Sequence, residues 1–438
     1  MIVYAFVPAK GTSSRIENKN MQFLDGERLY INALKKLLQC KQIDKVFLDT
    51  ESAAMYSMAD YLPVEFMQRD PKFASNATDG HQLFLNEIET NPDADIYVQL
   101  LCTSPFIDPE TIDRAIQALK DKSEYDSAIL MQRDKYYLWK DGTPTYDINH
   151  IPNSVDLAYT EIETMGLYIC RKEVAVNLKR RYGNKPLMLY AKPEEAIDVN
   201  TPVDLEFAKV YAAGLRRQDN KKLNLIKHFV SSPALSDLLD DMSIELGESC
   251  GSVINGWRSN IAGSKMLGRA NTLRLRSLLP DEDFRGIYDA LDSYEGIAEN
   301  DIIVVENECA EYAYFGDLNA RLAIRAGACG AVIDGMTRDR KQTELLGIPV
   351  FSRGYNATDV RRRAVLDYIN KPIKIAGYTV TPGDLIFADE NALVVIYQKH
   401  ETEVLQRCLE ALIKETKITK DIFEQTDVHD IVSMHGAF

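Results

Sequence analysis

A glycine-containing loop follows the first apolar segment and carries groups that could bind a phosphate. It reads Lys10-Gly11-Thr12-Ser13-Ser14-Arg15, with Lys19-Asn20 close behind. Small residues let backbone N–H groups approach a phosphate, hydroxyls add donors, and the cations balance its charge. The spacing is neither that of a Walker loop nor GxGxxG. On spacing alone, an ordinary glycine turn with surface lysines stays open as an alternative.

A second group of chemically active residues lies far along the chain, at Asp317, Asp334, Arg338 and Asp339. Asp334 ends an apolar strand candidate and Arg338-Asp339 follow in a loop, where α/β proteins place their ligands. An arginine fork suits the carboxylate of a 2-oxoacid, while an aspartate can hold Mg²⁺. The residues by themselves also allow a plain surface Arg–Asp pair.

The elements that must position the first loop follow an alternating pattern. Apolar, β-branched runs predict strands at 2–8, 45–48, 96–101, 127–131 and 165–170, and helical spacing covers 29–38 and 109–120. Strands that alternate with helices predict a largely parallel sheet covered on both faces. The N-terminal half is therefore expected to be an α/β domain.

The second half has a different pattern of short strands and helices. Strands are expected at 302–306, 331–334, 349–351 and 393–397, and helices from 232 onward, at 319–326 and at 402–415. Between the halves, residues 214–224 are polar and basic, which indicates a domain boundary, with a solvated helix end as the alternative. We expect domains at 1–214 and 225–438, the second ending in a helical tail.

Composition narrows the class of protein. The chain has 438 residues and a net charge of −15, which argues against binding nucleic acid through bulk electrostatics. It shows neither a signal-peptide pattern nor an apolar run long enough to span a membrane. The seven cysteines are scattered, which suggests neither disulfides nor a CxxC metal site. A cytoplasmic protein is the expectation.

Four motifs of the first half resemble the CMP-sugar synthetases, the acylneuraminate and KDO cytidylyltransferases. VPAKGTSSRIENKN is similar to their VPARGGSKRIPGKN-type loop, and YVQLLCTSPFIDPETIDRAI to their LQPTSPLR segment. EIETMGLYIC looks like their substrate-side segment and AIDVNTPVDLEFA like their DIDTPEDL motif. The resemblance covers residues 1–210 in family order and implies a Rossmann-like nucleotidyltransferase domain.

By this resemblance the first half transfers CMP from CTP to an acidic sugar or a related acid and releases pyrophosphate. Lys19 would contact the phosphates in a catalytic role, and Asp198 and Asn200 would hold Mg²⁺. The residues implied to bind CTP are Ala9, Lys10, Gly11, Ser13, Arg15, Asn20, Gln99 and Ser104.

Two positions depart from the family pattern. The usual loop lysine is Ser14, and the second metal-binding aspartate is Asn200. An amide oxygen can still bind Mg²⁺, but one negative charge is lost, so metal affinity should fall. A domain that binds CTP without catalysis stays open as an alternative.

The second half resembles the RraA-like family, which contains the 4-hydroxy-4-methyl-2-oxoglutarate aldolases. Asp317 and Arg338-Asp339 match its D-x20-RD signature, GACGAVIDGMTRD is similar to GVxGVVVDGxxRD, and GIPVFSRG to GFPVFARG. AGYTVTPGDLIFADENALVVI is similar to VxPGDxVxADxDGVVVIP. The resemblance covers about residues 225–400. Departures such as Gln342 and Ala392 lie outside this signature.

This second resemblance implies a lyase that depends on Mg²⁺ or Mn²⁺. Arg338 would bind the carboxylate and enolate oxygens of a pyruvate unit, Asp339 would hold the metal, and Asp317 would orient the water that protonates the enolate. Backbone N–H groups around Gly316 would add an oxyanion-type cradle. The alternative is that this half is a non-catalytic oligomerisation or regulatory module.

Together the two resemblances predict a bifunctional enzyme. Its partners would be CTP, an acidic small-molecule acceptor and a 2-oxoacid, with no nucleic acid and no membrane. The families imply a homo-oligomer, a trimer or a hexamer.

Overall fold

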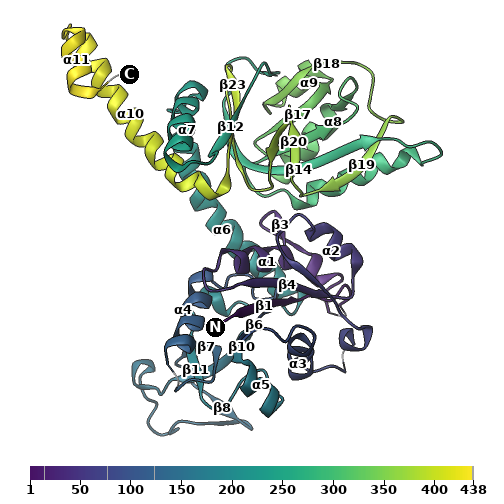
Figure 1. Ribbon diagram of the computed structural model, residues 1–438, viewed down its shortest axis with the longest axis vertical. Coiled ribbons are helices and arrows are strands. Elements are labelled where there is room, and N and C mark those ends of the chain that lie inside the picture. Colours follow the sequence, from purple (N-terminus) through teal and green to yellow (C-terminus); the bar gives the residue numbers. More distant parts are fainter. Residues whose placement is uncertain (14, 76, 123, 437–438) are drawn as a thin grey trace. The chain divides into compact units, whose positions relative to one another are not determined.

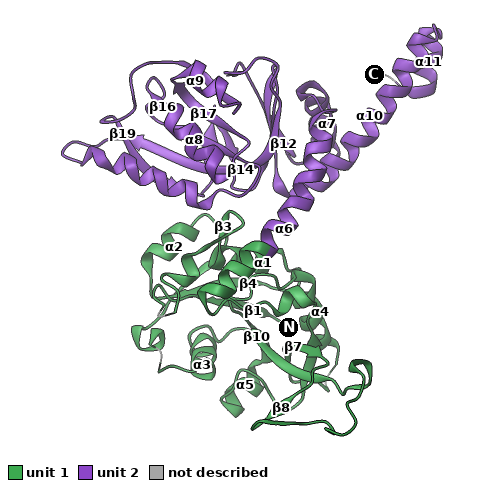
Figure 2. Ribbon diagram, turned by 180° about the vertical axis from the view of Figure 1, so that it is seen from behind, with its two compact units in different colours: residues 1–210 green, residues 211–438 purple. Residues whose placement is uncertain are grey.

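The computed structural model describes residues 1–13, 15–75, 77–122 and 124–436, so Ser14 lies outside the described residues. The chain divides into two compact units, Met1–Val210 and Tyr211–Phe438 (Figure 2). Both units are α/β folds, which confirms the fold class expected from the sequence (Figure 1). Among the described helices, none combines the length and apolar character needed to cross a bilayer.

Unit 1 is built on a sheet with seven strands in its described part. β10 runs antiparallel to both neighbours and the other neighbouring strands pair in parallel, so the prediction of a largely parallel sheet is confirmed. β1 lies inside the sheet because its apolar residues are buried along almost its whole length. In spatial order the strands are β11 (Pro186–Tyr190), β7 (Ser127–Asp134), β10 (Thr160–Arg171), β6 (Ile96–Leu100), β1 (Val3–Pro8), β4 (Lys45–Thr50) and β5 (Glu65–Gln68).

Helices cover the two faces of this sheet. Phe84 and Ile88 of α3 pack in one apolar cluster with Tyr97 of β6, while α1 contacts β1 and β4 from the opposite face (Figure 1). Asp79 begins α3 with a capping box, in which its carboxylate accepts from the backbone N–H of Gln82 and the Gln82 side chain accepts from that of Asp79. The helices are α1 (Leu29–Gln39), α2 (Ala53–Ala59), α3 (Gly80–Thr90), α4 (Pro109–Asp121), α5 (Lys172–Leu178) and α6 (Pro202–Lys227).

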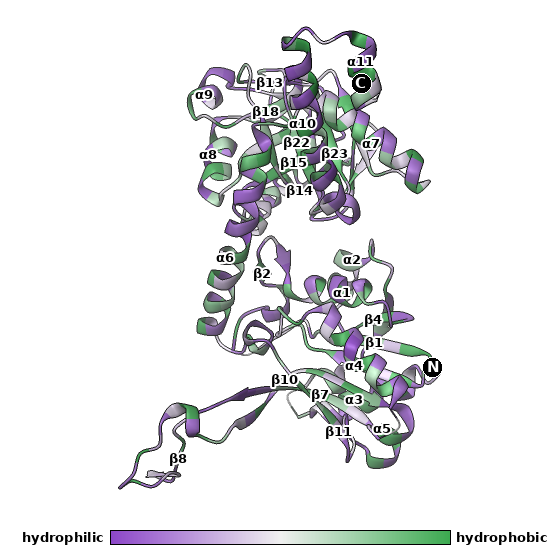
Figure 3. Cartoon of the chain, turned by 90° about the vertical axis from the view of Figure 1, so that its left-hand side faces the viewer, coloured by the Kyte–Doolittle hydropathy of each residue, from purple (hydrophilic) through white to green (hydrophobic). Residues whose placement is uncertain are grey.

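A long arm of residues 135–159 projects from the sheet of unit 1, between β7 and β10 (Figure 3). It contains the short strands β8 (Trp139–Lys140) and β9 (Thr143–Pro144), which pair with each other. Several of its apolar side chains face solvent, with Trp139 61%, Ile148 70% and Val155 72% exposed. A second two-stranded ribbon, β2 (Phe23–Leu24) and β3 (Glu27–Arg28), follows the glycine loop.

Unit 2 has a mixed sheet with ten strands in its described part. Its parallel core is β14, β15, β17 and β18, and apolar clusters lie on its faces. The strand path is β12 (Gly251–Asn255), β23 (Ala392–Ile396), β22 (Leu385–Ala388), β14 (Met266–Ser277), β15 (Asp301–Asn307), β17 (Gly330–Thr337), β18 (Val350–Tyr355) and β13 (Arg258–Ser259). Off this path lie β16 (Ala313–Phe315) and β19 (Ala364–Ile369), with the separate hairpin β20 (Ile373–Ile375) and β21 (Tyr378–Val380).

The helices of unit 2 begin with capping signals in the sequence. Ser231 caps α7 by accepting from the N–H of Ala234, and Pro233 occupies its first turn. Gly316 precedes α8, and Gly327, at φ 102°, ends it in the left-handed conformation that favours glycine. The helices are α7 (Ser232–Leu246), η5 (Phe284–Gly296, a 3₁₀ helix), α8 (Asp317–Ala326), α9 (Arg340–Leu345), α10 (Glu401–Phe423) and α11 (Val428–His435).

Candidate functional site

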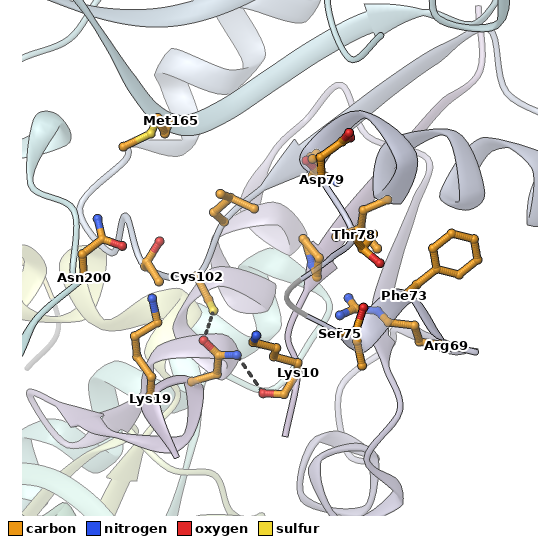
Figure 4. Close-up of a pocket in the computed structure, with 18 of the residues that line it drawn as sticks. Lys10, Lys19, Arg69, Phe73, Ser75, Thr78, Asp79, Cys102, Met165 and Asn200 are labelled. Atoms are coloured by element: carbon orange, nitrogen blue, oxygen red, sulfur yellow. Dashed lines mark hydrogen bonds between the residues drawn. The ribbon is translucent and has the colours of Figure 1, made fainter. Parts of the chain in front are cut away.

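A cavity of about 390 Å³ opens in unit 1 where β1 and β6 end. Because these strands are parallel neighbours, the residues that follow them come out at the same edge of the sheet, where α/β folds bind ligands. The structure brings seven of the predicted residues together in its wall: Lys10, Arg15, Lys19, Asn20, Gln99, Asp198 and Asn200 (Figure 4). The described wall residues do not include four others, which are Ala9, Gly11, Ser13 and Ser104.

The backbone of the glycine loop is held from within the protein. The N–H of Gly11 donates to Glu51 Oε1 at 2.7 Å, and the N–H of Ala9 donates to the carbonyl of Asp49 at 2.9 Å. A Cβ on Gly11 would lie 3.1 Å from Cβ of Ser52, which explains the small residue there. These two N–H groups therefore shape the loop, and the loop offers a ligand its side chains.

Asn20 braces the same loop against the end of β6. Its amide donates to the carbonyl of Lys10 at 2.9 Å, and its Oδ1 accepts from the Cys102 thiol at 3.2 Å (Figure 4). Burial raises the pKa of Cys102 to about 12, so this thiol stays protonated at neutral pH and serves as a donor. Asn20 thus fixes the position of Lys10.

Lys19 lies against the predicted metal ligands. Its Nζ donates to the carbonyl of Val199 at 3.1 Å, between Asp198 and Asn200. Burial lowers the pKa of Lys19, and the neighbouring cations Arg15 and Lys10 act in the same direction. A cavity that gathers cations in this way favours a polyanionic ligand, which would relieve their mutual repulsion.

Asp198 and Asn200 form a polar pair with unused acceptor capacity. The Asn200 amide donates to Asp198 Oδ2, while Asp198 Oδ1 is buried and has no hydrogen-bond partner among the described residues. The N–H of Asn200 donates to Asp204 Oδ2 at 3.0 Å, which fixes the turn. No group of three or more His, Cys, Asp or Glu side chains suited to a metal occurs among the described residues. The orphan oxygen fits a cation whose remaining ligands come from a phosphate and water.

Two arginines in the cavity wall have no counterpart in the sequence prediction. Arg69 directly follows β5 at the binding edge and forms a buried ion pair with Asp49, at 2.7 Å. Arg181 donates to Tyr168 Oη at 2.7 Å, and its guanidinium lies 3.5 Å from the centre of the Tyr168 ring. Arg69 could have been predicted from its place directly after a strand, whereas nothing in the sequence after α5 indicates a ligand-binding role for Arg181.

A second cavity, of about 730 Å³, lies in unit 2 at the ends of β16 and β17. Its wall brings together the three predicted residues Asp317, Arg338 and Asp339, along with Gln342. Asp317 follows β16 as the first residue of α8, and Arg338 follows β17 directly. A side wall of η5 and α8 is apolar and includes Ile287, Leu291 and Leu322. None of the described lining residues is a lysine.

The charged groups of this cavity hold one another in place. Arg338 pairs with Asp359 at 2.8 Å and lies 3.7 Å from Asp339. Asp339 Oδ2 accepts from the N–H of Asp317 at 3.1 Å, so this part of the expected oxyanion cradle is already used. Asp317 pairs with Arg321 one turn along α8, at 3.1 Å. Asp359 was missed because it lies in a loop twenty residues beyond the signature.

Asp334 lies outside this wall, although the sequence groups it with the other three residues. It pairs with Arg353 on β18 and accepts from the N–H of Ala376 at 2.9 Å. Its side chain is buried, so it ties neighbouring segments together. Ser104 of unit 1 is also internal: a Cβ on Gly166 would clash with its side chain.

Both units therefore have the general form of α/β domains with a charged ligand cavity at the carboxyl ends of their strands. Residues 4–177 match the family described as Cytidylyltransferase, and residues 233–395 match the family described as Aldolase/RraA. The first half of the chain is thus similar to cytidylyltransferases and the second half to RraA-like proteins, which confirms the two resemblances seen in the sequence motifs.

Curated relatives match one half or the other. Protein DlpA of Legionella pneumophila is 27% identical over 44% of this chain and 31% of its own length. The N-acylneuraminate cytidylyltransferase of Escherichia coli is 20% identical over 47% of this chain and 51% of its own length. Protein MJ0644 of Methanocaldococcus jannaschii is 31% identical over 31% of this chain and 67% of its own length. The chain thus spans about a third of DlpA and about half of the cytidylyltransferase.

Solved structures match in the same way. CMP:2-keto-3-deoxy-manno-octonic acid synthetase complexed with CTP is 17% identical, with a TM-score of 0.38, and the match covers 49% of this chain and 99% of that one. Streptomyces coelicolor RraAS2, described as an unusual member of the RNase ES inhibitor RraA protein family, is 22% identical with a TM-score of 0.38. This match covers 47% of this chain and 96% of that one.

Proposed function

We propose that unit 1 transfers CMP from CTP to an acidic acceptor and releases pyrophosphate. The observation that carries this proposal is the gathering of Lys10, Arg15 and Lys19 in one cavity with the Asp198–Asn200 pair. Such a cavity suits a nucleoside triphosphate. The Cytidylyltransferase match supports CTP as the nucleotide.

In the proposed reaction, an oxygen of the acceptor attacks the α-phosphorus of CTP and the bond to pyrophosphate breaks. Lys10 and Arg15 bind the phosphates, and Lys19 balances the charge that grows on the departing pyrophosphate. Asp198 and Asn200 would hold Mg²⁺, which supplies further charge compensation for the triphosphate. Arg181, a further cation in the wall of this cavity, suits the acid group of the acceptor.

The test is to incubate the protein with CTP, Mg²⁺ and a panel of acidic sugars and phosphonates while following pyrophosphate. Release that depends on one acceptor supports the transferase. CTP binding without release from any acceptor supports the inactive, CTP-binding alternative.

For unit 2 we propose a metal-dependent lyase that acts on a pyruvate-containing substrate. Arg338 binds the carboxylate and enolate oxygens of the pyruvate unit, and Asp317 orients the water that protonates the enolate after the C–C bond breaks. Asp339 would hold Mg²⁺ or Mn²⁺, which stabilises negative charge on the substrate oxygens. Because Asp339 Oδ2 already accepts from the N–H of Asp317, water would complete the ligand set, as Mg²⁺ commonly requires.

The absence of a lysine from the described cavity wall supports this metal-dependent scheme over one with a Schiff base. Oxaloacetate decarboxylation is a direct assay because it passes through the same pyruvate enolate. Pyruvate should form with Mg²⁺ or Mn²⁺, and EDTA or Asp339→Ala should stop it. No pyruvate from oxaloacetate or any 4-hydroxy-2-oxoacid would favour a non-catalytic oligomerisation or regulatory module.

We also propose a homo-oligomer. The apolar side chains exposed on the arm at 135–159 support an interface on unit 1, because apolar surface is more stable when it is removed from water. Light scattering during gel filtration should give a mass that is a multiple of 49.5 kDa, a trimer or a hexamer if the family symmetries hold.

A further inference from the structure

A chain of buried polar groups lies beneath the cavity of unit 1 and ends in its wall. Arg69 binds Asp49 with two hydrogen bonds between side chains, at 2.9 and 2.7 Å. Glu87 of α3 lies beside Asp49, whose charge acts on it, and its other oxygen accepts from the Gln99 amide at 2.8 Å. All four side chains are 3% exposed or less. One cation thus faces two carboxyl groups in a dry environment.

The buried network contains two carboxyl groups and one arginine, which indicates that Glu87 carries a proton. Two acids that share one arginine cannot both ionise in a buried site without a large cost. Burial, with the charge of Asp49, raises the pKa of Glu87 well above its ordinary value. Glu87 Oε1 has no donor among the described residues, and a proton on it lets it donate to Asp49. The remaining oxygen of Glu87 can then only accept.

This arrangement fixes which way the Gln99 amide points. Because Glu87 accepts, Gln99 must turn its NH₂ group toward it, and its carbonyl Oε1 is left for the cavity that Gln99 lines. Oε1 is buried and has no partner among the described residues. A buried orphan acceptor in a cavity wall is a place where a ligand with an N–H or O–H group gains most.

The network marks the end of the cavity suited to the base. Figure 4 shows Arg69 and Phe73 at the opposite end of the cavity from Lys19 and Asn200. With the triphosphate among the cations, the base lies toward the end that carries an aromatic side chain and the buried network. Cytosine presents an amino group where uracil presents a carbonyl, so a fixed acceptor distinguishes the two.

We propose that Glu87 is a positioning residue that holds the Gln99 carbonyl toward the cavity, where it accepts a hydrogen bond from the cytosine amino group and selects CTP over UTP. This rests on the proposed function of unit 1. Gln99 contacts the base, and Glu87 acts only through Gln99.

The test is calorimetric titration of the full chain with CTP and with UTP in the presence of Mg²⁺. Wild type should bind CTP about 10-fold or more tightly than UTP. The reason is that the cytosine amino group donates to the buried Gln99 carbonyl, whereas uracil leaves that acceptor unpaired. Gln99→Leu and Glu87→Leu should each bring the ratio of the two affinities close to one. The double variant should be no worse than Gln99→Leu, because both changes remove the same contact.

Glu87→Gln is the informative conservative variant. Its amide donates to Asp49 and accepts from Gln99, as the neutral acid does, so it should keep the preference within about 2-fold. Glu89→Leu, an exposed acid of the same helix, is the matched control and should also keep it. The ratio is the decisive readout, since loosened packing alone weakens both nucleotides equally.

The proposal is overturned if wild type binds the two nucleotides equally, or if the ratio is unchanged in both leucine variants. It is also overturned if Glu87→Gln loses the preference while its circular dichroism matches wild type. Should Glu87→Leu fail to fold, Gln99→Leu and Glu87→Gln still decide the matter. Failure of the proposed transferase activity can be distinguished from failure of this proposal. In that case the protein binds CTP selectively but releases no pyrophosphate with any acceptor.

Discussion

Among the side chains of the first cavity, Lys19 and Asp198 are expected to contribute most to the rate of CMP transfer. Lys19→Ala removes a cation held against the predicted metal ligands, and Asp198→Ala removes the orphan oxygen. Each should slow CMP transfer about 100-fold or more, the typical cost of losing a group that stabilises transition-state charge. Pyrophosphate release measures this, with exposed Lys41→Ala as the control. Near-normal rates in both variants would contradict the assignment.

Asn200 tests whether the pair binds a metal. Asn200→Asp restores a carboxylate beside Asp198 and should lower the Mg²⁺ concentration needed for half-maximal rate, because hard cations prefer charged oxygens. A Mg²⁺ titration of pyrophosphate release at saturating CTP measures the shift. An unchanged titration curve would mean that Asn200 is not a ligand.

The proton on Glu87 has a consequence for stability that does not require a ligand. A carboxyl group whose pKa is raised by folding costs stability as the pH rises from its unfolded pKa, about 4, toward its folded one. Glu87→Gln removes this titration, so its stability relative to wild type should increase with pH over that interval. Thermal unfolding of both proteins at pH 5 and pH 8 measures the difference, because all other titrations are shared. An equal difference at both values would argue against a buried neutral Glu87.

At the scale of elements, the start of α8 controls the second cavity. A Cβ on Gly316 would lie 2.6 Å from Asp339 Oδ2 and 3.1 Å from Cγ of Arg338, so Gly316→Ala must displace the Asp339 carboxylate and crowd Arg338. A displacement of about 1 Å can cost roughly 100-fold in rate, and we expect a loss of this order in pyruvate formation from oxaloacetate. Gly214→Ala is the control, since a Cβ there meets open space. A rate equal to wild type would show that the cavity tolerates the shift.

Elements with strong local signals could be predicted from the sequence. The apolar run at residues 2–8 contains β1, the helical pattern from residue 29 is α1, and the helix start expected at Ser232-Pro233 is the start of α7. Residues that follow β1 and β6 line one cavity because these two strands are parallel neighbours and end at the same edge of the sheet. The Asp49–Arg69–Glu87–Gln99 chain could not be predicted, because its members come from four separate segments that meet only in three dimensions.

At the scale of the whole chain, the predicted boundary at 214–224 lies inside α6, while the units part at Val210 and Tyr211. The polar residues there do not form a loose linker. Arg216 pairs with buried Asp301 at 3.2 Å, and Asp219 pairs with Arg269 at 2.7 Å. A helix whose charged residues form ion pairs has the same polar composition as a flexible linker. Composition alone therefore could not distinguish a helix from a linker at residues 214–224.

Each cavity is built from residues of a single unit, so the two proposed activities should be separable by mutation. Arg338→Ala removes the group proposed to bind the substrate carboxylate in unit 2 and should abolish pyruvate formation. CMP transfer should stay within about 2-fold of wild type, since mutations at sites that share no residues usually act independently. Lys19→Ala should do the reverse. Arg338→Lys should rescue little, because lysine lacks the planar pair of donors. Both variants are assayed for pyrophosphate and for pyruvate, with circular dichroism to confirm folding. A folded variant that loses both activities would show that the two units depend on each other during turnover, through an assembly or a shared intermediate.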